Sequence, residues 1–299
     1  MPQMNAPDLQ QVRTECIAIP AFRDADLHVD VLRTDLLHPV ISGNKWYKLR
    51  FYLEEAIQKQ VQLVVTFGGP WSNHIVATAA ACKWKGIPCA GIIRGEEPEQ
   101  WSDTLLEAKH FGMQLFFSSR EDFRAKKIRA SLLLQDPFII AEGGYGEAGV
   151  QGAATMLDDF KLEKYSHIVC AVGTGTMIAG LLQRALPQQQ VTGIPVLKVG
   201  DGFEQHIIPF LKQGHAPYKM IYDYHFGGYA KQTDELITFM NELHTQTSVP
   251  TDFVYTGKLF YAVNDLAQKG YFPEGSSILI VHSGGLQGNR SLEKGTLNY

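Results

Sequence analysis

From about residue 61 the chain alternates short, β-rich apolar runs with segments of helical period. This alternation is typical of a wound α/β sheet, because each strand can return to the next through a helix. Runs such as HIVCAV and SILIV are apolar without interruption, which indicates strands covered by helices on both faces of a mostly parallel sheet. We predict strands at 61–67, 87–93, 113–117, 138–141, 167–172, 191–199, 220–225 and 277–282. We predict helices at 72–85, 104–111, 150–160, 177–186 and 234–244.

The length of 299 residues exceeds that of a typical single domain. The chain has no internal repeat, no low-complexity linker and no block of like charges. We therefore expect two closely packed α/β domains, each a twisted and mostly parallel sheet flanked by helices. Residues 48–155 are expected to form the smaller domain, and residues 1–47 and 156–299 the larger one.

The composition argues for a globular protein that binds a small solute. Hydrophobic residues make up 45% and charged residues 19% of the chain, unlike a disordered protein. The formal charge of -4 gives no reason to expect nucleic acid or an anionic membrane as partner. No stretch approaches the ~20 apolar residues of a membrane span, and the N-terminus lacks a signal-peptide pattern. The four cysteines show no CxxC spacing and the ten histidines no zinc spacing, so we predict buried thiols, a cytoplasmic location and no metal site.

Two glycine-rich turns join predicted strands to predicted helices, where backbone N–H groups and a partial positive charge favour anions. The first, TFGGPWSNH, ends in Ser72 and Asn73, which either cap the helix or contact a bound ligand. The second, VGTGTM, offers successive amides that can cradle a phosphate. It does not fit GxGxxG, although Asp201 keeps a dinucleotide site open as an alternative. A third turn, HSGGLQG at 282–288, follows the last strand and is either a simple loop or part of the same site.

A lysine near a predicted helix start adds a different signal. The segment ISGNKWYKL places Lys45 directly after a Gly-Asn turn, and a lysine at such a place is usually solvated. Together with the glycine-rich turns it indicates a site for an aldehyde cofactor carrying one phosphate. The residues alone do not favour Lys45 over Lys48.

The chain resembles the family of 1-aminocyclopropane-1-carboxylate (ACC) deaminases and D-cysteine desulfhydrases, within the type II fold of pyridoxal-phosphate (PLP) enzymes. The resemblance covers most of the chain through SGNKWYKLRF (42–51), TFGGPWSNH (66–74), VGTGTMIAG (172–180), Tyr229, VYTGKLFYAV (254–263) and GYFPEGSSILIVHSGG (270–285). It implies a tryptophan synthase β-like fold, pyridoxal 5'-phosphate as cofactor and a homodimer.

The resemblance also implies roles for individual residues. Lys45 would carry the cofactor as a Schiff base, Ser72 would bind the substrate carboxylate or move protons, and Asn73 would lie beside the phenolic oxygen. His74 stands where ACC deaminases have glutamine and matches a histidine common in desulfhydrases, so we expect it at the substrate with Ser72 and Asn73. The phosphate-binding turn would consist of Gly173, Thr174, Gly175, Thr176 and Met177.

Four further positions concern the reaction. Tyr229 and Tyr255 correspond to the two active-site tyrosines of the family, although simple packing in a core is the alternative for both. Thr256 and Ser283 stand where ACC deaminases have a glutamate at the pyridine nitrogen and a leucine. A hydroxyl has no formal charge to hold that nitrogen protonated, so the cofactor would be a weaker electron sink.

We therefore expect α,β-elimination from a small amino acid such as D-cysteine, giving pyruvate, ammonia and sulfide. Three alternatives stay open at this point. The first is ACC deamination. The second is a racemase, a dehydratase or another β-eliminating enzyme. The third is a protein that binds the cofactor or a nucleotide without catalysis.

Overall fold

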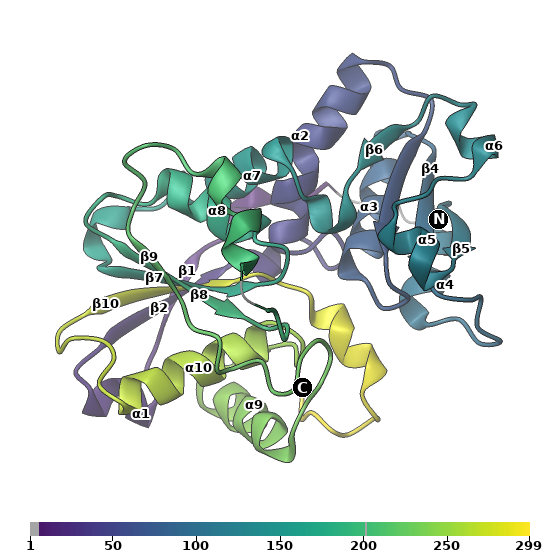
Figure 1. Ribbon diagram of the computed structural model, residues 1–299. Coiled ribbons are helices and arrows are strands. Elements are labelled where there is room, and N and C mark those ends of the chain that lie inside the picture. The colour runs from purple at the N-terminus through teal and green to yellow at the C-terminus, as the bar shows by residue number, and fades with distance from the viewer. Residues whose placement is uncertain (1–5, 201) are drawn as a thin grey trace.

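The computed structural model describes residues 6–200 and 202–299, and two sheets organise this part of the chain (Figure 1). The strands are β1 (Thr14–Ile17), β2 (His28–Arg33), β3 (Val64–Gly68), β4 (Cys89–Arg94), β5 (Gln114–Ser118), β6 (Phe138–Ile140), β7 (His167–Val172), β8 (Gln190–Pro195), β9 (Tyr218–Met220) and β10 (Ser277–His282). A six-stranded sheet has the order β1-β2-β10-β7-β8-β9, and a four-stranded sheet has the order β5-β4-β3-β6. All paired neighbours run parallel except β1 and β2.

Helices cover both sheets. The α-helices are α1 (Pro20–Asp24), α2 (Asn44–Gln58), α3 (Asn73–Lys85), α4 (Asp103–His110), α5 (Arg120–Arg124), α6 (Ala130–Leu133), α7 (Glu147–Ala154), α8 (Thr176–Arg184), α9 (Asp234–Thr247) and α10 (Thr256–Gln268). Short 3-10 helices are η1 (Leu9–Gln11), η2 (Thr34–Leu37), η3 (Glu142–Gly144), η4 (Thr155–Leu157), η5 (Leu162–Lys164), η6 (Phe203–His206), η7 (Ile208–Phe210) and η8 (Leu286–Ser291). The predicted α/β class with two mostly parallel sheets is confirmed, whereas the domain limits at residues 48 and 155 stay predictions.

Two of the predicted strands, 167–172 and 277–282, match β7 and β10 to the residue. Two others were placed too far along the chain: β8 ends at Pro195 rather than 199, and β9 ends at Met220. Pro195 has no N–H for the ladder, and the pairing with β7 ends one hydrogen bond later, where the Val196 amide donates to the Val172 carbonyl. Strands β1 and β2 were not predicted. Their segments carry charged residues, among them the buried Asp30 and Arg33, and thus lack the continuous apolar run of a doubly covered strand.

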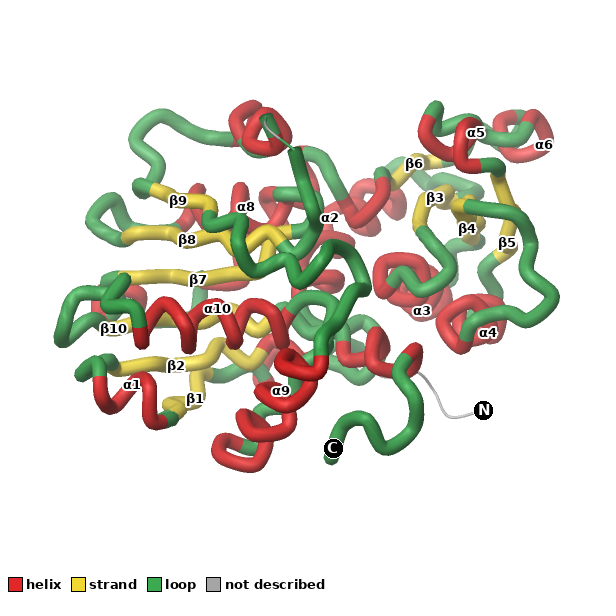
Figure 2. Tube along the Cα trace, turned by 60° about the horizontal axis from the view of Figure 1, so that its bottom comes forward, coloured by secondary structure: helices red, strands yellow, loops and turns green. Residues whose placement is uncertain are grey.

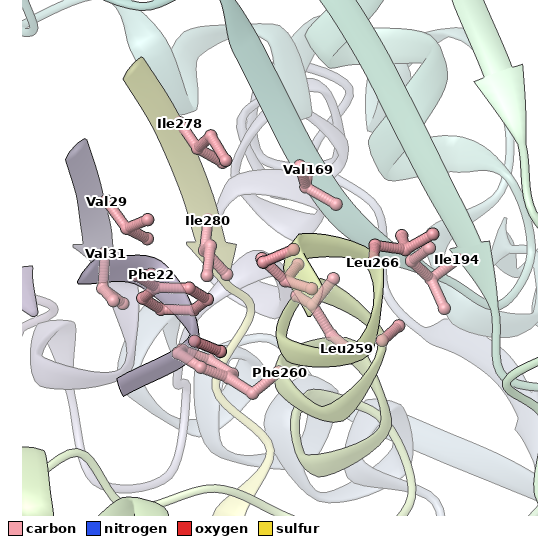
Figure 3. Packing of buried hydrophobic residues seen from close by; sticks show 14 of the residues in the cluster. Phe22, Val29, Val31, Val169, Ile194, Leu259, Phe260, Leu266, Ile278 and Ile280 are labelled. Atoms are coloured by element: carbon pink, nitrogen blue, oxygen red, sulfur yellow. The ribbon is translucent and has the colours of Figure 1, made fainter. Parts of the chain in front are cut away.

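The larger sheet is buried on both faces, as the unbroken apolar runs predicted. Along β7, Val169 and Ala171 belong to one core, whereas Ile168, Cys170 and Val172 belong to the other. Successive side chains of a strand point to opposite faces, so each run supplies both cores. The first core lies against α1 and α10, and Figure 3 shows Phe22 and Phe260 reaching over β2 and β10. α10 crosses in front of this sheet in Figure 2. The second core is covered by α7 and α8.

The smaller sheet has the same plan. Val64 and Ile93 face a core shared with α2, α3 and α4. The neighbouring Val65 and Ile92 face the opposite side, where Phe123 of α5 and Leu132 of α6 cover them. No helix in the described ranges 6–200 and 202–299 is both long and apolar enough to span a bilayer.

The prediction that all four cysteines are buried was wrong for one of them. Cys82, Cys89 and Cys170 are buried and free, as predicted, but Cys16 is exposed. Cys16 lies on the edge strand β1 and alternates with Ile17, which faces the core, so its side chain points to the uncovered side.

Candidate active site

A cavity of about 320 Å³ lies where strands of both sheets end. Its wall includes residues at the ends of β3, β4 and β7 and the loop after β10. In parallel sheets this carboxyl edge is where ligands usually bind. The structure brings together in this wall the predicted residues Lys45, Ser72, Asn73, His74, Gly173, Thr174, Gly175, Met177, Tyr229, Tyr255 and Ser283. Thr176 and Thr256 do not belong to the wall, and Asp201 lies outside the described residues.

Lys45 stands in the first turn of α2 with its amine in the cavity. Its Nζ donates to Asn44 Oδ1 at 2.8 Å and lies 5.8 Å from the centre of the Tyr255 ring. Burial lowers the pKa of this amine from 10.5 to about 8, and the charge of Asp252 opposes that effect. A depressed pKa makes the neutral, nucleophilic amine available near neutral pH.

Gly43 explains how the lysine is held. Its φ of 57° and ψ of -138° are open to glycine, and a Cβ there would overlap the carbonyl of Ser283. The amide of Asn44 donates to that carbonyl at 3.1 Å. The Gly-Asn turn therefore rests directly on the HSGG turn, although the two are far apart in the sequence.

The second glycine-rich turn opens α8. Gly175 is its N-cap at a φ of 86°, and no side chain of the described residues caps this helix end. Thr174 and Thr176 share a hydrogen bond of 2.9 Å between their hydroxyls, and Met177 Sδ accepts from Asn44 Nδ2 at 3.4 Å. The free first-turn amides of α8 thus face the cavity that holds Lys45, as a phosphate site requires.

The first glycine-rich turn, which leads to α3, supplies polar groups to the same cavity. Ser72 is the N-cap of α3 and accepts from the Ile75 amide at 3.4 Å, so the predicted cap exists beside any role in the cavity. Asn73 Nδ2 donates to the Gly285 carbonyl at 3.1 Å, which fixes its amide. Asn73 Oδ1 is buried and has no hydrogen bond to any described residue.

The tautomer of His74 follows from its neighbours. Thr66 Oγ1 donates its proton to the Ile140 carbonyl at 2.8 Å, so it can only accept from His74 Nε2, also at 2.8 Å. His74 is 2% exposed, and burial and the nearby charges of Lys45 and Lys48 lower its pKa to about 3. His74 is therefore neutral, with a buried Nδ1 that has no partner among the described residues.

The two tyrosines form a pair in the wall. Their ring centroids are 6.2 Å apart in an edge-to-face arrangement. Burial raises the pKa of Tyr229 and of Tyr255, so both hydroxyls keep their protons at neutral pH. Tyr229 is 40% exposed and stands at the mouth, whereas Tyr255 lies deeper, above Lys45.

Thr256 lies behind the wall rather than in it. It is fully buried, and its hydroxyl donates to Asp252 Oδ1 and accepts from the Asp252 amide, both at 2.8 Å. Asp252 also accepts from the amides of Val254, Tyr255 and Thr256 at 2.9–3.0 Å. Asp252 thereby binds the amides that lead into α10, and its buried carboxyl has a raised pKa because desolvation outweighs these bonds.

Three charged residues of this region had no role assigned from the sequence. Lys48 lines the cavity and is 5% exposed, and burial together with the charge of Lys45 holds the pKa of its amine well below the usual value. Arg94 lines the mouth, and Asp252 lies behind it. Lys48 was visible as a possible alternative to Lys45, but no local pattern distinguishes Arg94 or Asp252 from surface charges.

The absence of a metal site stays a prediction. On the antiparallel pair β1–β2, Cys16 lies opposite Asp30, and ligand atoms of these two residues and His28 lie within 4.8 Å of one another. Asp30 already accepts from Lys164 at 2.7 Å and from Tyr165 at 2.6 Å. Cross-strand neighbours of this kind have no sequence spacing that would reveal them.

The residues present fit PLP. The amides that open α8 and the amine of Lys48, which have no side-chain partner among the described residues, suit its phosphate, and the amine of Lys45 suits its aldehyde. Asn73 Nδ2 has a second N–H beyond the one used by Gly285, which suits a phenolic oxygen. The volume lies at the small end of the range found for ligand sites.

Comparisons with known proteins agree with this fit. The model of the family "Pyridoxal-phosphate dependent enzyme" matches residues 8–284. A putative ACC deaminase of Pyrococcus horikoshii is 30% identical over 89% of this chain and 87% of its own length. A bifunctional mitochondrial D-cysteine desulfhydrase/ACC deaminase of Arabidopsis thaliana is 28% identical over 86% of this chain and 72% of its own length.

A solved structure of a protein with a similar name has the same fold as this chain. The crystal structure of an ACC deaminase homologue superposes with a TM-score of 0.81 at 27% identity, covering 96% of this chain and 93% of that one. The match to a family of enzymes decides against the non-catalytic alternative. The chain therefore belongs to the family of pyridoxal-phosphate-dependent enzymes, within the group that includes ACC deaminases and D-cysteine desulfhydrases.

Proposed function

We propose that this enzyme removes a β-substituent from a small amino acid, with D-cysteine as the first substrate to test and Lys45 as the lysine joined to the cofactor. The observation that carries the proposal is the buried amine of Lys45, which shares one cavity with the open amides of α8 and the hydroxyls of Ser72 and Tyr255. The depressed pKa of Lys45 supports both its covalent role and its role as a base.

We assign the following roles in binding and catalysis to the residues of this chain. The amides from Gly173 to Met177 and the amine of Lys48 would bind the phosphate. Ser72 and the first turn of α3 would bind the substrate carboxylate, because a helix N-terminus attracts negative charge. Lys45, once released by the substrate amine, would take the proton from Cα. The bound cofactor supplies the electron sink for this step.

Tyr255 would shape the cavity above Lys45 and exchange a proton with the leaving group. Tyr229, whose ring packs edge-to-face against that of Tyr255, would offer a second hydroxyl in the same wall for this exchange. The neutral His74 would act on the substrate as a hydrogen-bond acceptor and not as an acid.

ACC deamination is the second candidate, since the names of similar proteins include both activities. We rank it lower because neither Thr256 nor Ser283 provides the carboxylate that would keep the pyridine nitrogen protonated. The homodimer and the cytoplasmic location stay predictions.

Two measurements test the proposal. First, cofactor-loaded protein is reduced with borohydride and the modified peptide is mapped; the label is expected on Lys45. Lys45→Ala should abolish the visible band, whereas Lys48→Ala should keep it with weaker cofactor binding. Second, pyruvate and sulfide from D-cysteine are compared with 2-oxobutyrate from ACC, and both enantiomers of cysteine, serine and chloroalanine are screened. A label on Lys48 would refute the lysine assignment, and faster turnover of ACC would refute the substrate assignment.

A further inference from the structure

Arg94 is a cation at the cavity mouth for which the functions proposed above have no use. It is the last residue of β4, and its side chain lines the cavity together with Gly69 and Trp71. Its guanidinium packs against Gly69, with Nη2 3.4 Å from the place a Cβ would take, and lies 5.9 Å from the centre of the Phe123 ring. In the described ranges it makes no ion pair and no side-chain hydrogen bond.

The guanidinium shares the cavity wall with Tyr229 and Tyr255. Its charge opposes the rise in the pKa of Tyr229, although burial is the main cause of that rise. The arginine is thus within the electrostatic reach of a substrate side chain at the mouth. It is exposed, so a ligand can approach it without first displacing a protein partner.

The charges of the described wall do not balance. Lys45, Lys48 and Arg94 are basic, and the one carboxylate in the wall is Glu142. Glu142 is already paired with Lys126 at 2.7 Å. Asp252 lies behind the wall with its oxygens occupied by amides and a hydroxyl of α10. A cavity with one sign of charge raises the local concentration of ions of the opposite sign.

Two anionic groups are accounted for by the proposed function, and each has its own place. The phosphate has the amides of α8 and Lys48, and the α-carboxylate has the first turn of α3. Arg94 belongs to neither place: it comes from the end of the neighbouring strand β4 and packs against Gly69, in the turn that leads to α3. We propose that Arg94 is the subsite for a second anionic group on the substrate side chain, so that the preferred substrates are amino acids with an acidic side chain. This inference rests on the proposed function and specifies the substrate class of the same site.

A guanidinium is well suited to this task, because its fork of N–H donors matches carboxylate, phosphate and sulfonate oxygens in pairs. The position at the mouth leaves the geometry around Cα to Lys45 and Ser72. The contribution is expected to be moderate, since the group is exposed and salt screens it.

The test compares two amino acids of the same shape and different charge. Aspartate and asparagine, in both enantiomers, are titrated into the cofactor-loaded protein at low ionic strength, and binding is followed by the change in visible absorbance. Wild type is expected to bind aspartate about tenfold more tightly than asparagine. In Arg94→Gln this preference should vanish while the dissociation constant of asparagine stays the same, and Arg94→Lys should keep part of it.

Arg120→Gln is the matched control, because it removes the same charge from an exposed position on α5 outside the cavity wall, and it should keep the preference. Equal weakening of both ligands in Arg94→Gln would assign Arg94 to the shared α-carboxylate and overturn the proposal. The proposal would also be overturned if wild type bound the two ligands equally or bound neither. It would be overturned as well if the preference for aspartate survived in Arg94→Gln. The borohydride label and the turnover of D-cysteine or chloroalanine test the proposed function separately, so the two failures are distinguishable.

Discussion

The pH dependence of cofactor uptake follows directly from the burial of Lys45. Attack on the cofactor aldehyde requires the neutral amine, and burial disfavours the charged form, which brings the pKa from 10.5 down to about 8. At pH 7 about one amine in ten is then neutral, compared with about one in three thousand for an ordinary lysine. This difference corresponds to about 3 kcal/mol in the free energy of deprotonation.

The experiment mixes the cofactor-free protein with PLP between pH 6 and pH 10 and follows the visible absorbance. Since the neutral form increases with pH, the rate constant should rise about tenfold per pH unit below pH 8 and level off above it. N-α-acetyl-lysine, measured under the same conditions, corrects for the ionisation of PLP itself. A rate that still rises steeply at pH 10, or uptake that persists in Lys45→Ala, would show that the buried amine is not the group that reacts.

Three substitutions test the structure around the site. Gly43→Ala should lower the free energy of unfolding by at least about 1–3 kcal/mol and weaken cofactor binding, because its Cβ would overlap the Ser283 carbonyl; urea titration and the cofactor dissociation constant measure both effects, and a neutral result would contradict the turn geometry. Lys258→Met should destabilise the fold by about 1–3 kcal/mol, since the buried amine donates to the carbonyls of Val196, His225 and Gly228, and only the last two also accept from backbone amides. An unchanged urea midpoint would contradict this. Thr256→Glu should give no ACC turnover, and it should melt at a lower temperature at pH 8 than at pH 6, because the new carboxylate would repel Asp252 unless one of the two is protonated. A stable variant that turns over ACC would refute this.

The sequence was most informative where a whole segment is buried, because burial then selects every residue of that segment. β7 and β10 are covered on both faces, and this burial produces unbroken apolar runs whose ends are visible. The glycine-rich turns were identifiable because parallel strands bring their carboxyl ends to one edge, where helix N-termini and backbone amides gather. The α/β class and the approximate position of the cavity therefore followed from local patterns.

The parts that could not be predicted depend on contacts between distant segments. Gly43 rests on the Ser283 carbonyl, and Asn73 binds the Gly285 carbonyl, 212 residues away. Arg94 resembles any charged residue at the end of a strand until the fold places it in the wall of a cavity. The choice of Lys45 over Lys48 rested on the family resemblance, because both amines are buried in the same cavity.

The two positions that were expected to separate the activities act in different ways. A hydroxyl has one proton, and that of Thr256 is donated to Asp252, so Thr256 cannot donate to a ring nitrogen while this bond persists. The hydroxyl of Ser283 lines the cavity and makes no hydrogen bond with the described residues, so its proton is available. In ACC deaminases the position of Thr256 would bring a full charge to the cofactor. In this chain Thr256 brings no charge to the cofactor. Of these two positions, only Ser283 has a hydroxyl proton that it can donate to the ring nitrogen.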